Sequence, residues 1–333
     1  MPKVVKIPLI VLASLIGLAL LLLAGVQTSW FKNTAATKAT QFLSKELGTE
    51  VSIGSVQISY FDELVAKDLY LADQRGDTMI YISSLSIDYD LFSFSQEKIG
   101  LNSVILENAI VDLGIHKENK ELNIQFLIDY FTPPKSENPS AAQVILFDKV
   151  KLLNTQFRYF QEKYDPPKGR YFDENDMHFS QINGHLRNFE IINDSLHFVL
   201  ENISGTEKSG LTIKNLSALT TISSTVMEFA ELELKTPNSD ITDYLRFDYE
   251  SYGDFSDFID LVGIDANLQN SVISTQDLAL FSHTLRDYNE KIFATGKVEG
   301  KISNLKSNSL QLAIGSHTKF EGKAKLKGLP DIN

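Results

Sequence analysis

Residues 47–90 read LGTEVSIGSVQISYFDELVAKDLYLADQRGDTMIYISSLSIDYD, and this stretch decides the fold. Apolar and polar residues alternate along it with the period of a β-strand that has one apolar face. The alternation shifts register at residues 54–55 and again at 83–84, and the polar turn DQRGD over 73–77 separates two of the runs. The stretch therefore predicts consecutive strands joined by short turns, with their aliphatic side chains on one side.

The predicted apolar face of the first strands is our candidate for lining a groove. Its members are Val51, Ile53, Val56, Ile58, Leu69, Leu71, Ile80, Ile82, Leu85, Ile87, Leu101, Val104 and Leu106. Many such faces in a line would form a long apolar trough, whereas the same residues gathered at one centre would form an ordinary buried core. The sequence alone hardly separates these two interpretations, and it leaves open which face of each strand looks inward.

The alternation continues downstream to the end of the chain. Runs at 144–147, 150–153 and 157–160 predict further short strands, and 296–302 resembles 322–328. The capping residues Thr236-Pro237-Asn238-Ser239 predict a short helix over 240–247, and we expect further short helices that interrupt the strands at 126–131, 254–262 and 276–290.

These patterns predict a mainly β protein with few βαβ units. The wandering periods and interrupting helices favour an elongated, curved antiparallel sheet over a sandwich. About 20–25 strands spaced by ~4.8 Å would make a rod of roughly 100 Å.

Upstream, residues 7–26 read IPLIVLASLIGLALLLLAGV and carry no charge. A helix of this length spans the hydrocarbon core of a bilayer, so we expect a transmembrane signal anchor; a cleaved secretory signal is the alternative. Lys3 and Lys6 place the N-terminus in the cytoplasm, and the rest of the chain is then exported. The residues that we expect to hold the anchor in the membrane are Ile7, Leu9, Leu12, Leu15, Ile16, Leu18, Leu20, Leu22, Val26 and Trp30.

Composition excludes several classes of function. The net charge of −12 argues against a nucleic-acid partner and against broad attachment to anionic lipid, and the absence of cysteine removes disulfides and thiol chemistry. The acidic patch at 173–178 lacks the spacing of a calcium loop, and we predict no metal site and no cofactor. The tripeptide Arg75-Gly76-Asp77 could serve an adhesin only if its turn is exposed. No nucleophile has an evident base, so we do not expect an enzyme.

The sequence divides into five expected parts. They are a cytoplasmic tail and transmembrane anchor (1–27), an amphipathic helix (28–48), a first β region (49–132), a linker (133–142, PPKSENPSAA) and continuing β repeats (143–333). The last part stops soon after Gly328-Leu329-Pro330, and from this we expect the chain to be truncated at its C-terminus.

The anchor, the helix that follows it and the stretch 47–90 resemble the N-terminal region of TamB proteins of the AsmA-like group, in the form found in Bacteroidota. The likeness rests on Leu47-Gly48, on the spacing of Val51 to Ile58, on Leu69-x-Leu71-x-Asp73 and on Asp77-Thr78. The segment GSHTKFEGKAKLKGLPDI at 315–332 is similar to one found downstream in that group.

This resemblance implies a single-pass inner-membrane protein whose body is a taco-shaped β-structure with an apolar groove in the periplasm. It implies conduction of phospholipid between the inner and outer membranes and support of outer-membrane protein assembly. An Omp85-type outer-membrane barrel is the implied partner, contacted through a C-terminal domain absent here. The alternative is an anchored periplasmic scaffold that binds unfolded outer-membrane strands by edge pairing and carries no lipid.

Overall fold

The computed structural model of the protein describes residues 40–59, 63–89, 98–118, 121–131, 144–162, 171–192, 195–315 and 317–328. The predicted transmembrane segment at 7–26, Trp30 and the predicted linker at 133–142 lie outside these residues. Within the described ranges, no helix is long and apolar enough to cross a membrane.

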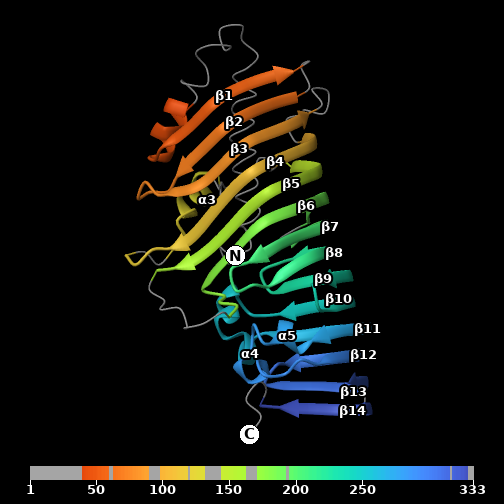
Figure 1. The fold of residues 1–333 in the computed structure, drawn as a ribbon. Coiled ribbons are helices and arrows are strands. Elements are labelled where there is room, and N and C mark those ends of the chain that lie inside the picture. The colour runs from red at the N-terminus through yellow and green to blue at the C-terminus, as the bar shows by residue number, and fades with distance from the viewer. Residues whose placement is uncertain are drawn as a thin grey trace, which may run out of the picture. The chain divides into compact units, whose positions relative to one another are not determined.

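Strands dominate the fold, as the alternation predicts, and each strand pairs with its neighbours in sequence (Figure 1). The first six are β1 (Val51–Ser59), β2 (Glu63–Ala72), β3 (Thr78–Tyr89), β4 (Lys98–Ile115), β5 (Val144–Gln161) and β6 (Asp176–Ile192). The other eight are β7 (Ser195–Glu207), β8 (Thr212–Ile222), β9 (Val226–Lys235), β10 (Asp240–Asp248), β11 (Gly263–Ser274), β12 (Lys291–Lys301), β13 (Asn304–Ile314) and β14 (Thr318–Lys327). Together they form one 14-stranded sheet that is not closed, with β1 and β14 at its edges.

The chain forms two units, which we treat separately. The N-terminal unit comprises the described residues of 6–165 and 180–189, and the C-terminal unit comprises those of 166–179 and 190–333. The boundary between the units falls within β6.

The prediction of an antiparallel sheet is wrong for β4 and β5, which pair in parallel. A parallel pair needs a crossover long enough to carry the chain back to the start of the first strand. The connection over residues 116–143 has that length and contains the helix α3 (Gln125–Phe131), so the sheet is mixed.

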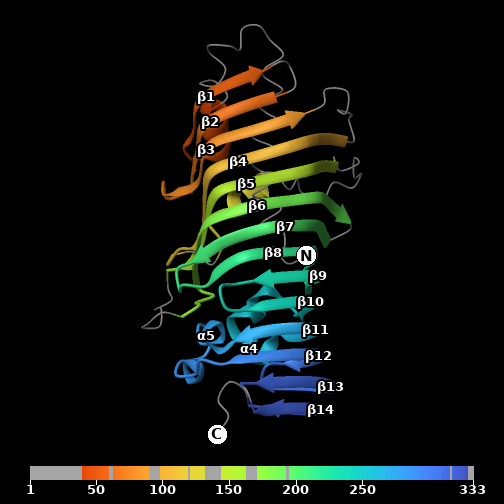
Figure 2. The ribbon, with the colours of Figure 1, turned by 45° about the vertical axis from the view of Figure 1, so that its right-hand side comes forward.

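The strands are fewer and longer than predicted, because several apparent strand ends are β-bulges. Asp68, Asn108 and Asn154 adopt φ of 53°, 49° and 51° in the middle of β2, β4 and β5. Such residues shift the register and bend a strand without ending it. The runs predicted at 144–147, 150–153 and 157–160 are therefore one 18-residue strand, and β4 and β5 bend along their length (Figure 2).

A bulge also explains the one helix that was predicted wrongly, at 240–247. This segment is β10, and the register shifts between Asp243 and Tyr244. The shift leaves Ile241, Tyr244 and Leu245 at i, i+3 and i+4, which imitates helical spacing.

The remaining helical predictions coincide with short helices. These are α3, η2 (Tyr252–Asp257) with α4 (Phe258–Leu261), and α5 (Thr275–Leu278) with η3 (His283–Leu285).

The amphipathic helix predicted at 28–48 is helical over residues 40–47, which precede β1, and residues 28–39 lie outside the described part of the chain. Its Leu43 and Leu47 are buried, and Phe42 is exposed. Gly48 follows with φ of 65°, the left-handed conformation typical of a C-cap. The Ser44 hydroxyl accepts a hydrogen bond from the Val51 amide at 2.9 Å, which ties the helix to the start of β1.

Candidate functional site

The strand registers place the predicted groove residues on one face of the N-terminal unit. Residues that are paired directly across strands project to the same side of a sheet. Two of the cross-strand rows are Val51–Leu71–Ile80 and Ile53–Leu69–Ile82, and a third is Val56–Ala66–Leu85–Leu106. Ile87 of β3 pairs with Val104, and Tyr89, two residues after Ile87, pairs with Leu101. Ile58 pairs with Leu64 in the backbone register, and its side chain lies outside the described part.

Most of this face is buried in the N-terminal unit. Leu64, Leu69, Ile80 and Ile82 are 0% exposed, and Leu85 is 1% exposed. Ile124 and Leu127, at the start of α3, are also buried. In this unit most of the candidate lining residues therefore form a buried core, whereas Ile53 and Val56 on β1 are half-buried.

The same alternation organises the C-terminal unit, where one row crosses eight strands. Its members are Leu196, Ile222, Met227, Phe247, Ile264, Gly300, Leu305 and Leu326. The adjacent row, one residue along each strand, is His197, Thr221, Glu228, Arg246, Asp265, Glu299, Lys306 and Lys325. Adjacent rows point to opposite faces. The C-terminal unit therefore has one apolar face and one polar face.

Here the apolar face is only partly covered. Phe247 makes edge contacts with Phe255 of η2 and Phe258 of α4, at ring-centroid distances of 6.5 and 5.5 Å. On β14, by contrast, Phe320 is 39% exposed and Leu326 is 43% exposed. The apolar face thus opens to solvent toward the end of this unit.

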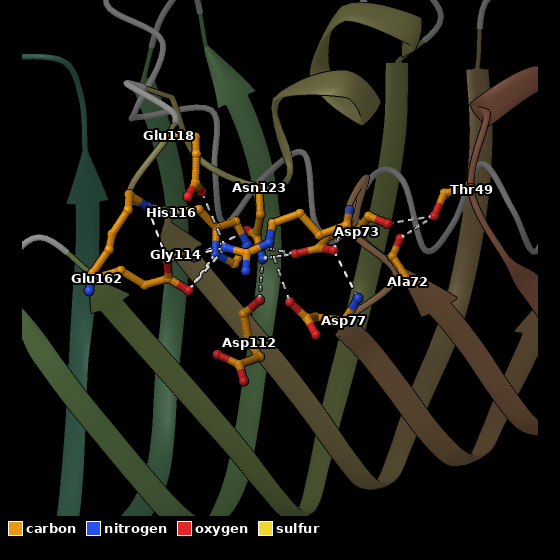
Figure 3. Close-up of polar contacts among 12 residues, drawn as sticks. Thr49, Ala72, Asp73, Asp77, Asp112, Gly114, His116, Glu118, Asn123 and Glu162 are labelled. Atoms are coloured by element: carbon orange, nitrogen blue, oxygen red, sulfur yellow. Dashed lines mark hydrogen bonds and ion pairs between the residues drawn. The ribbon is translucent and has the colours of Figure 1, made fainter.

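A second candidate site lies at one end of the N-terminal unit, around the turn that joins β2 to β3 (Figure 3). The carboxylate oxygen Asp73 Oδ1 accepts hydrogen bonds from the backbone amides of Arg75 and Asp77, at 2.8 and 3.0 Å. Gly76 supplies the positive φ, 89°, that this turn requires. The Thr49 hydroxyl donates to the Asp73 carbonyl at 2.7 Å. The turn is therefore held firmly by its own backbone and by Thr49, two residues before β1.

Two carboxylates flank a buried histidine in this cluster. His116 follows β4 and is 3% exposed; its Nε2 lies 2.8 Å from Asp73 Oδ2, and its Nδ1 lies 2.8 Å from Glu162 Oε1. A neutral imidazole has one N–H, whereas the imidazolium has two and can donate to both carboxylates. The geometry therefore fits a protonated His116 between Asp73 and Glu162 (Figure 3).

The pKa shifts of these three side chains agree with a protonated His116 between two ionised carboxylates. Burial alone would lower the pKa of His116, but its hydrogen bonds to Glu162 and Asp73 outweigh burial and raise that pKa above 6.5. Burial would raise the pKa of Asp73, but hydrogen bonds from His116 and two backbone amides lower it. The hydrogen bond from His116, with one from the Lys117 amide, lowers the pKa of Glu162 to about 2.

The same cluster engages the Arg75-Gly76-Asp77 tripeptide. The Arg75 guanidinium donates to both carboxylate oxygens of Glu162, at 3.2 and 3.1 Å. An adhesive Arg-Gly-Asp turn needs a free guanidinium, so this contact disfavours the adhesin interpretation.

One group of described residues could hold a cation. Ligand atoms of Asp73, Asp77 and His116 lie within 4.8 Å of one another. The Asp73 and His116 atoms already face each other at hydrogen-bond distance, and the Arg75 guanidinium adds positive charge beside Asp77. A proton and a guanidinium thus fill the place that a cation would take, and the cluster fastens the turn to the ends of β4 and β5.

The acidic patch at 173–178 is used differently. Asp176 forms an ion pair with Lys208, and the His178 amide donates to Glu207 at 2.9 Å. The structure does not bring three ligand atoms of this patch together among the residues it describes.

Sequence reasoning missed the His116 cluster. Its partners lie 43 and 46 residues away, and Glu162 meets His116 only because β4 and β5 run in parallel. No local pattern in the sequence encodes that pairing.

Neither a known protein family nor a curated protein matches this chain in sequence.

Proposed function

We propose that this chain is an inner-membrane-anchored periplasmic protein that conducts phospholipid along the apolar face of its sheet toward the outer membrane, in support of outer-membrane protein assembly. The anchor and the location rest on the sequence of residues 7–26 and on the resemblance to TamB proteins. We also propose that the apolar face of the sheet forms an elongated, curved groove. No catalytic step belongs to it.

One observation carries the proposal: an apolar row continues across the paired strands β7–β14 of a sheet that is not closed. Acyl chains gain about 0.8 kcal/mol for each methylene removed from water, wherever along the row they lie. The row has an apolar side chain on every strand except β12, where Gly300 stands, and this keeps the gain similar along most of its length. A lipid can then move from strand to strand without meeting a deep energy minimum, while its headgroup stays in water.

The buried face of the N-terminal unit sets a condition on this mechanism. Side chains at 0% exposure leave no room for an acyl chain. In the proposal, lipid therefore contacts the C-terminal unit first, where Phe320 and Leu326 are exposed, and enters the N-terminal unit only if its cover is displaced.

The alternative function is a scaffold that binds unfolded outer-membrane strands. The observation in its favour is β14, an edge strand with a row of unpaired backbone groups that another strand could join. A scaffold of this kind would bind extended peptide and would carry no lipid.

Two leucines on opposite faces of β8 allow a matched test. Leu216 lies on the apolar face, opposite Leu234, and Leu219 lies on the polar face, opposite Ala230. The assay follows transfer of a fluorescent phospholipid from donor nanodiscs that carry the full chain to acceptor vesicles. We expect Leu216→Asp to lower the transfer rate, because it places a charge on the apolar face, and Leu219→Asp to leave it unchanged. Equal rates for the two variants would contradict a path along this face.

A further inference from the structure

The end of the chain has a charge opposite to the rest. Residues 291–328 contain eight lysines and two glutamates, with no arginine or aspartate, for a net charge of +6. The whole chain carries −12, so the remaining residues carry −18. The net charge therefore conceals a basic region.

The sheet register gathers most of these lysines on one face. On β14, Lys319, Lys323, Lys325 and Lys327 alternate with residues of the apolar face. Lys306 of β13 lies directly opposite Lys325, and Lys297 of β12 lies on the same side. We call these six residues the lysine face; their side chains are exposed, with 61% exposure at Lys306 and 54% at Lys297.

Two of the nearby acidic side chains are already paired with the inner lysines, and a third, Glu321, lies among the lysines of β14 and accepts a hydrogen bond from the Gln311 side chain at 3.3 Å. Asp265 lies 3.0 Å from the Lys297 ammonium, and Glu299 lies 3.2 Å from that of Lys306. Within the described ranges, no ion pair reaches a lysine of β14. Lys306 and Lys325 instead face each other as like charges, an arrangement that destabilises a strand pair. The β14 lysines thus carry charge that folding does not require.

Lysine on an edge strand also protects against edge-to-edge aggregation. That explanation covers β14 alone, whereas the lysine face extends two strands inward to β12. The same face carries Phe293, which is 49% exposed and lies in the row Phe293–Ala313–Lys319. Lysines beside an exposed aromatic ring are typical of a surface that contacts anionic lipid headgroups.

We propose that the lysine face binds the surface of a bilayer that contains anionic phospholipid. The ammonium groups contact headgroup phosphates, and Phe293 enters the headgroup region. This contact is separate from the apolar face and needs no conduction of lipid. Failure of the lysine face to bind would therefore leave the proposed function standing.

The test uses the full chain reconstituted in phosphatidylcholine nanodiscs, mixed with vesicles and separated by flotation. Vesicles are of phosphatidylcholine alone or of phosphatidylcholine with phosphatidylglycerol. We expect co-flotation with the anionic vesicles only, and its loss at high salt, because salt screens exposed charges. The triple variant Lys323→Gln/Lys325→Gln/Lys327→Gln should lower binding on the order of 100-fold.

A matched control removes three exposed lysines elsewhere, Lys67→Gln/Lys117→Gln/Lys214→Gln, and should leave binding within about twofold of the unmodified chain. Circular dichroism verifies that both variants are folded, and the salt series on the unmodified chain is independent of any variant. Equal binding to both kinds of vesicle, equal loss in the two triple variants, or equally tight binding of soluble poly-glutamate or single-stranded DNA would overturn the proposal.

Discussion

The two units follow the same alternation of side chains, yet they treat their apolar faces differently. In the N-terminal unit, Leu69 and Ile82 are 0% exposed, whereas Phe320 and Leu326 at the far end of the C-terminal unit are 39% and 43% exposed. The difference lies in the elements around the strands. In the N-terminal unit, a hydrogen bond ties Ser44 of the 40–47 helix to the start of β1, and another ties Asn123, two residues before α3, to Asp112 of β4. In the C-terminal unit, α4 contacts Phe247 of β10. Alternation creates an apolar face, and the connecting segments decide whether it is a core or a surface.

The largest expected effect comes from truncating matched residues on these two faces. Ile82→Ala should lower the free energy of unfolding of the N-terminal unit by about 3–4 kcal/mol, because it removes buried methylenes and leaves a cavity. Leu326→Ala should cost less than about 1 kcal/mol, because its side chain is already partly in water. Chemical denaturation of each variant measures both values, and comparable losses at the two sites would contradict the contrast between core and surface.

The next effect concerns the fastening of the β2–β3 turn. His116→Ala leaves the buried Asp73 without its charged partner, so we expect a loss of about 2–4 kcal/mol in the same unit. Lys117→Ala, at the adjacent exposed position, is the control and should change stability by less than about 0.5 kcal/mol. Hydrogen exchange at the amides of Arg75 and Asp77 should accelerate in the histidine variant, and an unchanged exchange rate there would show that the network does not hold the turn.

The pH dependence of stability should identify the protonation state of the same network. The raised pKa of His116 means that its contribution is complete below 6.5 and is lost as the pH rises through the folded-state pKa. The lowered pKa values of Asp73 and Glu162 mean that their contribution is present above their ordinary values, 3.8 and 4.5, and is lost as the pH falls. Stability of the N-terminal unit should therefore be greatest between pH 4.5 and 6.5.

Denaturation at a series of pH values checks this profile. In His116→Ala the fall above pH 6.5 should disappear. If that variant keeps the same fall, another group is responsible and the imidazolium assignment is wrong.

The smallest effect tests the bulges that bend the strands of the N-terminal unit. Asn154 has φ of 51°, and its side-chain amide donates to Asn108 Oδ1 at 2.7 Å. Asn154→Val should destabilise by about 1–2 kcal/mol, because a β-branched residue rarely adopts this conformation, whereas Asn154→Gly should cost a few tenths. Equal costs for valine and glycine would indicate that the left-handed conformation is not required.

Much of this fold could be predicted from the sequence, because strand alternation is local. The apolar residues from Val51 to Leu106 share one face as the alternation indicates, and the turn at 73–77 lies where its polar residues place it. The bulges could not be recognised as such: a left-handed Asn108 or Asn154 interrupts the alternation just as a turn does. The parallel pairing of β4 with β5 also depends on a long crossover whose direction no local pattern records.

The candidate sites also differ in whether local sequence order is enough to predict them. The apolar face follows from residue order within each strand, whereas the His116 cluster needs three segments that are 43 and 46 residues apart. The lysine face stands between these cases. Its alternation on β14 is visible in the sequence, but its continuation to Lys306 and Lys297 depends on the register of three strands.

Photocrosslinking of lipid to single positions tests the central claim most directly. Photoreactive residues replace Met227 and Phe320 on the apolar face, and Leu219 and Glu233 on the opposite face, in the full chain within its native membrane. The account predicts phospholipid adducts at Met227 and Phe320 and none at Leu219 or Glu233. Adducts at all four positions, or at none of them, would contradict it.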